Sequence, residues 1–129
     1  MQPSAFEGLA RARYVSLATF RRDGREVATP VWCAAEGDEL FVFSAADAGK
    51  VKRIRAGSRA RLATCDVRGG LTGSWHDASA ELITGEPGVA MALRALRRKY
   101  GWQMWLADAG ARLSGRFERR AYIRLRLVQ

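Results

Sequence analysis

The sequence is poor in the residues that build metal sites and disulfide frameworks. Its 129 residues include one histidine, His76, and two cysteines, Cys33 and Cys65, which are too far apart for a Cys-x-x-Cys pair. A zinc site would have too few soft ligands. In a chain without an export signal, both thiols are expected to stay free. We therefore expect two buried free cysteines and no metal.

Long apolar runs are also absent. No stretch approaches the roughly 18 consecutive apolar residues of a membrane-spanning helix, and residues 1–13 hold no apolar segment typical of a signal peptide. These absences predict a cytoplasmic protein without a membrane partner. Hydrophobic residues still make up 48% of the chain, which is enough for the core of a single domain over residues 1–129.

Lysine is scarce although the chain is strongly basic. Its 22 basic residues, against 13 acidic ones, give a formal charge of +9, and only Lys50, Lys52 and Lys99 are lysines. A positive excess can attract an anionic partner, but this excess of arginine accompanies a high alanine content and is typical of compositional drift. The basic residues are scattered and not interleaved with aromatics on one sheet, so we expect no nucleic-acid partner.

Alternating apolar and polar residues predict a mainly β fold with short helices. Ser4 and Glu7 have the spacing of a capping box, which predicts a helix over residues 4–12. Six strands are expected, at residues 14–20, 25–36, 39–45, 59–67, 71–84 and 120–128. Tight turns join the first three into a meander, and Gly73 marks a bulge or a close approach of the backbone. The pattern indicates a six-stranded antiparallel barrel, closed or half-open.

Three helical segments interrupt the strands. The first covers residues 47–57, with Asp47 as its expected cap and Gly57 at its end. The second starts at Pro87, and after Gly101 a third continues over residues 102–113.

The start of the helix over residues 47–57 is a candidate anion site. Backbone N–H groups at a helix N-terminus attract phosphate; Gly49 leaves space there, and Lys50 and Arg53 lie one turn apart. A phosphate contact alone would scarcely offset the cost of association, so an apolar, planar part of the ligand must be buried too. The alternative is a solvated basic helix face.

A proline inside an expected strand is a second candidate. Pro30 has no N–H to donate, so its position marks an edge or a bulge, and the backbone groups of Thr29 and Val31 become free to meet a polar ring edge. A kinked edge strand without a ligand is the alternative.

The aromatic residues after Gly101 could belong to a core or a dimer interface, or they could stack on a ligand. Trp102 and Trp105 are three residues apart, which is more typical of a core or a dimer interface than of a ligand stack. The single histidine, His76, has no evident Ser, Cys or carboxylate partner, so nothing indicates a hydrolytic triad.

Several short motifs occur in an order that resembles one known group of proteins. They are residues 14–20 (YVSLATF), 23–25 (DGR), 29–32 (TPVW), 49–55 (GKVKRIR), 61–66 (RLATCD) and 99–102 (KYGW). Each motif is short, but together they span nearly the whole chain. They resemble the pyridoxamine-phosphate-oxidase-like superfamily, and most closely its actinobacterial deazaflavin-dependent oxidoreductases.

The resemblance implies a split β-barrel of the FMN-binding type that forms a homodimer with cofactor sites at the subunit interface. By this resemblance Lys50 and Arg53 hold the cofactor phosphate. Residues matching the family's other contacts are Thr29, Pro30 and Val31 along the ring, Ser44 and Ala45 at the linker, and Trp102 reaching across from the partner subunit.

The resemblance also has departures that bear on the cofactor. The chain lacks the C-terminal substrate-binding segment of true pyridoxamine phosphate oxidases, which argues against vitamin B6 oxidation. The Arg and Lys that those enzymes place on their second strand are replaced here by the Thr-Pro-Val-Trp run. This favours the deazaflavin F420 over FMN, and surplus arginines would suit the polyglutamate tail of F420.

The expected function is therefore hydride transfer between reduced F420, or FMN, and a small electron-poor acceptor such as an enone, quinone or tetrapyrrole. In such enzymes the cofactor carries the chemistry and the protein orients it. The alternatives are a carrier that binds the cofactor without turnover, a heme-handling relative, and a nucleic-acid-binding barrel.

Overall fold

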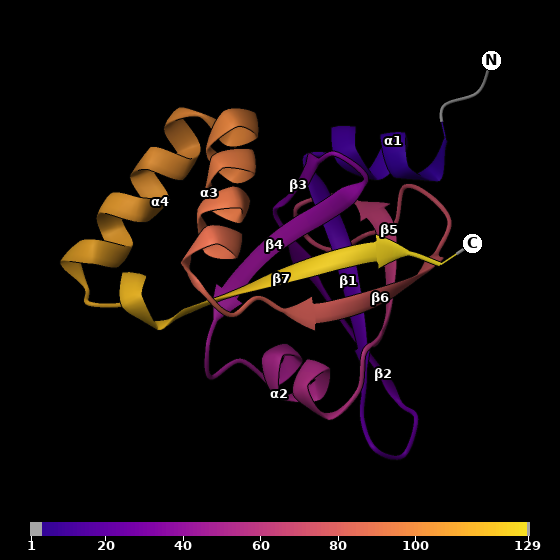
Figure 1. Cartoon of the computed structure of the whole chain (residues 1–129). Helices are drawn as coiled ribbons and strands as arrows, with labels where there is room; N and C mark the ends of the chain where they lie inside the picture. Colours follow the sequence, from indigo (N-terminus) through magenta and orange to yellow (C-terminus); the bar gives the residue numbers. More distant parts are fainter. Residues whose placement is uncertain (1–3, 129) are drawn as a thin grey trace.

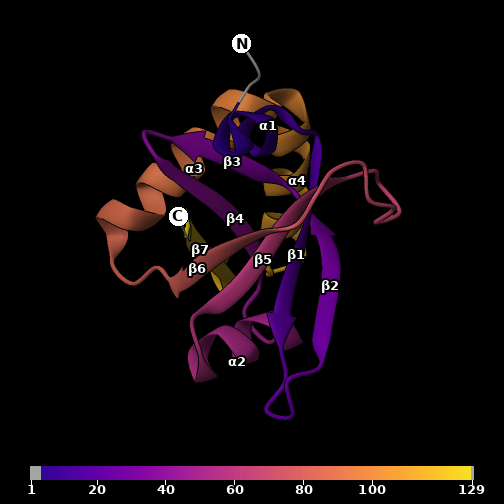
Figure 2. The same ribbon diagram turned by 90° about the vertical axis from the view of Figure 1, so that its right-hand side faces the viewer.

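The computed structural model describes residues 4–128 as one antiparallel sheet that curls into a half-barrel (Figures 1 and 2). Its seven strands are β1 (Tyr14–Phe20), β2 (Glu26–Val31), β3 (Cys33–Glu36), β4 (Glu39–Ala45), β5 (Arg59–Cys65), β6 (His76–Leu82) and β7 (Arg120–Leu127). They are arranged in the order β2-β1-β5-β6-β7-β4-β3. The mainly β fold with short helices is confirmed, with seven strands where six were expected.

The additional strand arises because the expected strand over residues 25–36 is divided at Trp32. Its first part, β2, pairs only with β1, and its second part, β3, pairs only with β4. The chain therefore passes from one edge of the sheet to the other within one residue. Pro30 lies in an edge strand, as its missing N–H predicts.

The strand expected to begin at residue 71 is also shorter than predicted. Leu71 makes only an isolated bridge to Cys65, and β6 begins at His76. Gly73 lies in the segment between them, where an added Cβ would stand 2.4 Å from the Thr64 hydroxyl oxygen. The predicted close approach at Gly73 is therefore confirmed, and it keeps this segment against β5 without regular pairing.

Four α-helices and one short 3₁₀ turn connect the strands. They are α1 (Ala5–Arg11), α2 (Gly49–Ala56), α3 (Glu86–Tyr100), α4 (Trp102–Leu113) and η1 (Phe117–Arg119). The Ser4 hydroxyl accepts a hydrogen bond from the Glu7 N–H (3.2 Å), as the capping spacing predicts. Asp47 was wrongly expected to cap α2, because Ala48 occupies the N-cap position without a side-chain hydrogen bond.

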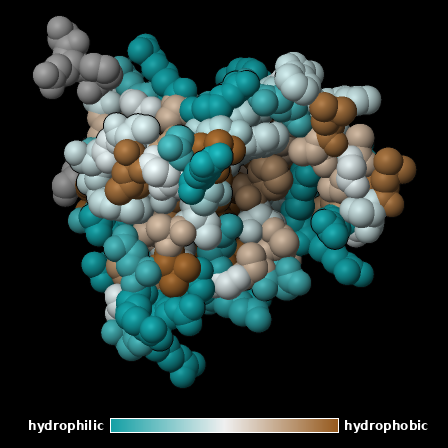
Figure 3. All heavy atoms as spheres, turned by 180° about the vertical axis from the view of Figure 1, so that it is seen from behind, coloured by the Kyte–Doolittle hydropathy of each residue, from teal (hydrophilic) through white to brown (hydrophobic). Residues whose placement is uncertain are grey.

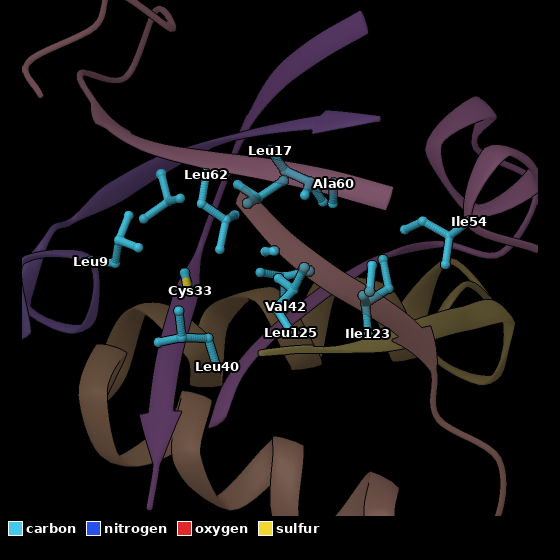
Figure 4. Packing of buried hydrophobic residues seen from close by; sticks show 14 residues of the cluster. Leu9, Leu17, Cys33, Leu40, Val42, Ile54, Ala60, Leu62, Ile123 and Leu125 are labelled. Carbon is cyan, nitrogen blue, oxygen red and sulfur yellow. The ribbon is translucent and has the colours of Figure 1, made fainter. Parts of the chain in front are cut away.

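The core fills the inside of the curled sheet (Figure 4). Leu17, Leu62 and Leu125 come from three different strands, while Leu9 of α1 and Ile54 of α2 join them from opposite ends of the half-barrel (Figure 1). The inward positions alternate along the strands, as the period of two requires. This packing explains why the sequence pattern alone indicated a barrel.

Both cysteines are free and buried, as expected. Burial raises the pKa of the Cys33 thiol to about 12, and the positive charge of Lys99 opposes that rise. A thiol with so high a pKa is a core residue and not a nucleophile at neutral pH.

No helix within residues 4–128 is long and apolar enough to cross a bilayer.

Two leucine substitutions compare how core and surface side chains contribute to the free energy of unfolding. Leu62 is fully buried, whereas Leu113 is 90% exposed. We expect Leu62→Ala to lower the free energy of unfolding by about 2–5 kcal/mol because it leaves a cavity, and Leu113→Ala to change it by no more than about 0.5 kcal/mol. Urea denaturation of the two variants measures the difference, and equal losses would contradict the described packing.

Candidate functional site

A pocket of about 390 Å³ opens where β2 ends and the chain leaves that edge of the sheet. Its lining residues are Tyr14, Pro30, Val31, Trp32, Phe43, Ser44, Lys50, Val67 and Ala107. Four of them, Pro30, Val31, Ser44 and Lys50, are residues that the sequence predicted for one site. They come from β2, β4 and α2, so tertiary structure brings the two candidate motifs together.

Aromatic side chains form one wall of this pocket. Trp32 is stacked on Tyr100, with ring centroids 4.7 Å apart and an interplanar angle of 12°, and it meets the edge of Phe43 at 6.2 Å. Both geometries are favourable for aromatic pairs. The wall presents a flat, apolar surface to whatever the pocket holds.

The C-terminal end of α3 fixes the position of Trp32. The Tyr100 hydroxyl accepts a hydrogen bond from the Cys33 N–H (2.9 Å) and donates one to the Arg13 carbonyl oxygen (2.9 Å). The Lys99 ammonium group donates to the carbonyl oxygens of Ala12 (2.6 Å) and Cys33 (2.5 Å). Because these bonds hold the backbone next to Trp32, Lys99 and Tyr100 position the aromatic wall. Lys99 and Tyr100 belong to one of the motifs that carry the family resemblance, but the motif did not predict this role.

The other end of the pocket is cationic. Lys50 is half-buried in the lining, and burial, followed by the charge of Arg53, lowers its pKa. The Arg53 Nε donates to the Thr19 hydroxyl oxygen (2.6 Å), and its guanidinium lies so close to Gly49 that an added Cβ would stand 2.8 Å from Nη1. A side chain at position 49 would displace the guanidinium from the helix start.

No acidic side chain within residues 4–128 forms an ion pair with Lys50 or Arg53. Two neighbouring cations without a carboxylate repel each other, and burial adds to the cost of charging Lys50. An anion bound between them would relieve both effects.

A second hollow, of about 620 Å³, adjoins the first and shares Phe43 and Ser44 with it. Its other lining residues are Ala45, Ala46, Asp47, Ala111, Arg116, Arg119 and Arg120. The predicted site residue Ala45 lies here. Sequence reasoning missed the three arginines, which carry no recognisable motif and approach Ala45 only because β7 pairs with β4.

A buried ion pair anchors α4 beside this second hollow. Arg120 Nη1 and Asp108 Oδ1 are 2.7 Å apart and both side chains are only 7% exposed, while Arg97 holds the other carboxylate oxygen at 3.0 Å. The Arg120 guanidinium also lies 4.5 Å from the ring centre of Phe43. Breaking such a pair would leave an uncompensated buried charge, so its contacts fix α4 against the strands.

Three of the predicted site residues lie outside both lining sets. Arg53 follows Lys50 by three residues on α2 and contacts Thr19. Thr29 is half-buried in β2, and its hydroxyl oxygen is buried without a hydrogen-bond partner among residues 4–128. Trp102 is 70% exposed on α4. His76 lines a separate hollow near α1 and the end of β7.

Comparison with solved structures shows that the fold is widely shared. An F420 reductase is 18% identical over 99% of this chain and 97% of its own, with a TM-score of 0.61. HutZ, the heme storage protein of Vibrio cholerae, is 13% identical over 95% of this chain and 87% of its own, with a TM-score of 0.70. A conserved hypothetical protein of Mycobacterium tuberculosis is 17% identical over 100% of this chain and 83% of its own, with a TM-score of 0.69. At these identities the likeness concerns the fold alone.

A search of curated protein sequences gave no significant match. The family model described as pyridoxamine 5'-phosphate oxidase, however, matches residues 1–129. With a half-barrel fold and the resembling motifs in order along it, the chain belongs to the pyridoxamine 5'-phosphate oxidase family of split β-barrels.

Proposed function

We propose that this protein is an oxidoreductase that transfers a hydride between reduced F420 and a small electron-poor organic acceptor, with FMN as the alternative cofactor. The observation that carries the proposal is the pocket that joins an aromatic wall at Trp32 to an uncompensated cation at Lys50. Both cofactors have a flat conjugated end and a phosphate end, and the pocket offers a matching surface for each. The two free, buried cysteines suit the cytoplasm.

The chemistry of the donor set fits a phosphate. Lys50 supplies a charged ammonium group and Arg53 a second cation one turn away, while the start of α2 adds unpaired backbone N–H groups. The Arg53 guanidinium already donates to Thr19 and is thereby held in place. These groups would bind and orient the phosphate end.

The rest of the pocket fits a flat ring. Pro30 and Val31 line it from the end of an edge strand, together with the aromatic pair of Trp32 and Phe43. Small-molecule pockets are typically mostly apolar with a few convergent polar groups. The predicted contribution of Thr29 is supported by its buried hydroxyl oxygen, which has no partner within the described chain.

The second hollow favours F420 over FMN. It continues from the first at Ser44 and is lined by Arg116, Arg119 and Arg120, with Asp47 as its one acidic residue. A polyglutamate tail carries several carboxylates, for which guanidinium groups are the strongest side-chain partners. FMN has no such tail and would leave Arg116 and Arg119 unused, whereas Arg120 is already held by Asp108.

When bound, the cofactor supplies the hydride chemistry itself. The contribution of this chain is to bind, to orient and to exclude water: Lys50 and Arg53 hold one end, and Trp32, kept in place by Tyr100, covers the other. No side chain needs to act as a nucleophile. Tyr14 and Ser44 are the hydroxyl-bearing residues of the lining, and either could pass a proton between solvent and the acceptor.

We further propose a homodimer with the cofactor at its interface. Val67 lines the pocket but is 61% exposed, so one wall of the pocket is apolar and uncovered in a single chain. A second subunit would complete it. The contribution of Trp102 across the interface remains a prediction about the dimer, since the position of Trp102 within one chain does not bear on it.

The choice of cofactor and of activity can be tested by titration and turnover. We expect F420 to bind more tightly than FMN in a fluorescence titration, and the reduced complex to be oxidised by a panel of enones and quinones. Binding without turnover on any acceptor would instead support a carrier. Failure to bind either cofactor would remove the proposal.

Lys50 and Lys52 form a matched pair for the phosphate site. Both are on α2, but Lys50 lines the pocket and Lys52 is exposed. Because one charge-assisted hydrogen bond contributes about 1.5–3 kcal/mol, we expect Lys50→Ala to weaken cofactor affinity roughly ten- to hundredfold, and Lys52→Ala to leave it nearly unchanged.

The pH dependence of affinity follows from the same residue. The lowered pKa of Lys50 means that its positive charge is lost on going to alkaline pH earlier than for an ordinary lysine. Cofactor affinity of the wild type should therefore fall at alkaline pH, and Lys50→Ala should flatten that part of the profile. Equal profiles would contradict the assignment of Lys50.

Two exposed valines test the dimer. Val67 at the pocket is 61% exposed and Val128 near the C-terminus is 59% exposed. We expect Val67→Asp to weaken both dimerisation and cofactor affinity by roughly tenfold or more, because a charge replaces a side chain buried at the interface. Val128→Asp should change neither. Analytical ultracentrifugation with cofactor titration measures both, and a monomeric wild type that binds cofactor normally would overturn the dimer proposal.

A further inference from the structure

The motif at residues 61–66 carries part of the family resemblance, yet it contributes no side chain to either pocket of the proposed site. It ends at Asp66, directly after β5, where the chain enters a turn. The residue that follows, Val67, lines the same pocket as Pro30 and Lys50. The position of Val67 in that wall therefore depends on the turn after β5.

The carboxylate of Asp66 closes this turn, which we call the Asp66 turn (residues 66–70). Its Oδ1 accepts hydrogen bonds from the N–H groups of Arg68 (2.9 Å) and Gly70 (2.8 Å). Two backbone hydrogen bonds add to these: the Asp66 N–H donates to the Gly70 carbonyl oxygen (2.9 Å), and the Gly69 N–H donates to the Asp66 carbonyl oxygen (3.0 Å). Aspartate side chains commonly stabilise turns in this way.

The Asp66 turn also packs on the edge strand of the pocket. Gly69 has a φ of +90°, a conformation that favours glycine, and a Cβ added there would stand 3.7 Å from Pro30 Cδ. Strand β1 lies between β5 and β2 in the sheet, so the turn reaches across one strand to approach the proline. Figure 2 shows the loop after β5 extending beside the upper end of β2. The contact with Pro30 fixes the turn relative to the pocket.

Exposure alone does not distinguish Val67, which is 61% exposed. Figure 3 shows hydrophobic side chains that reach the surface as separate groups among hydrophilic ones, and single exposed apolar residues are normal in proteins. Val67 differs because it lines the pocket together with Pro30 and Val31. It also differs because the Asp66 carboxylate holds the N–H group of the residue that follows it.

We infer that Asp66 is a positioning residue of the proposed cofactor site: its carboxylate fixes the turn that holds Val67 beside Pro30 at the ring end of the pocket. The inference rests on the proposed function, because it takes this pocket to hold the cofactor ring. A turn that is already closed loses less conformational freedom when a ligand binds, and such preorganisation raises affinity. Asp66 does not line the pocket, so it acts on the ligand through Val67.

A role of Asp66 through its charge makes the opposite prediction. Asp66 forms no ion pair within residues 4–128. By charge alone, a carboxylate near a site for an anionic cofactor would weaken binding. Removal of the carboxylate therefore lowers cofactor affinity if Asp66 positions Val67, and raises it if only the charge of Asp66 matters.

Three variants of the full chain test the inference. Asp66→Ala removes both side-chain hydrogen bonds, and we expect it to weaken F420 affinity roughly tenfold in a fluorescence titration, because the loosened turn has to be ordered on binding. Asp66→Asn keeps an oxygen that can accept the same hydrogen bonds, so its affinity should stay within about twofold of the wild type. Gly70→Ala, whose Cβ would stand 2.8 Å from Asp66 Oδ2, displaces the carboxylate and should weaken affinity as Asp66→Ala does.

Asp23 provides a matched control. Its Oδ1 likewise accepts a hydrogen bond from a backbone N–H in a tight turn, that of Arg25 (3.0 Å), but residues 21–25 line neither pocket of the proposed site. Asp23→Ala should therefore leave F420 affinity unchanged, and equal losses in Asp23→Ala and Asp66→Ala would overturn the inference. If Asp66→Ala does not fold, the opposite expectations for Asp66→Asn and Gly70→Ala still decide.

Hydrogen exchange gives a readout that does not depend on the cofactor. The amide protons of Arg68 and Gly70 should exchange roughly tenfold faster in Asp66→Ala than in the wild type, and at the wild-type rate in Asp66→Asn. The amides of the core strands should keep their rates in both variants. Unchanged exchange at Arg68 and Gly70 in Asp66→Ala would mean that the carboxylate does not hold the turn, and the inference would fail.

The same titrations separate this inference from the proposals on which it rests. A wild type that binds neither F420 nor FMN removes the proposed function; if only FMN binds, the series is repeated with FMN. A wild type that binds its cofactor no more tightly than Asp66→Ala removes the inference alone. All titrations are made at concentrations where ultracentrifugation finds one oligomeric state for every variant. If the difference in affinity disappears under that condition, Asp66 acts through self-association and the inference is also overturned.

Discussion

The missing N–H of Pro30 is the constraint on which much of this structure depends. A strand that contains proline cannot be paired fully on both sides, so β2 is an edge strand and ends at Val31. The chain then moves to the opposite edge of the sheet as β3. The half-barrel therefore stays split at this point, and the pocket lined by Pro30, Trp32 and Lys50 lies there.

Such a break exposes backbone groups that must be satisfied from elsewhere. Tyr100 and Lys99, at the end of α3, provide those hydrogen bonds to Cys33, Ala12 and Arg13. The same tyrosine stacks on Trp32. The end of α3 thus satisfies the backbone groups left unpaired between β2 and β3 and also holds Trp32 in the pocket wall. The contacts that stabilise this part of the sheet therefore also determine the shape of the pocket.

Charge is distributed in two different ways around this framework. Arg120 and Asp108 form a buried, mutually compensated pair that fixes α4, whereas Lys50 and Arg53 are close together without an acid within the described residues. The first arrangement is structural, because each charge satisfies the other. The pair of Lys50 and Arg53 is electrostatically unfavourable by itself, and a bound anion would offset the repulsion between the two cations. The proposed phosphate site is based on this pair.

The sequence by itself determined the β character and the helix start at Ser4, and it limited Pro30 to an edge or a bulge and Gly73 to a bulge or a close approach, because each depends on local backbone geometry or on a period of two. It could not predict the division at Trp32 or the late start of β6 at His76, since strand pairing depends on which distant segments meet. Only the tertiary structure brought Lys50 to Pro30 and placed the arginines of the chain end beside Ser44. Those outcomes depend on sheet curvature and on the Arg120–Asp108 pair, which no spacing along the chain encodes.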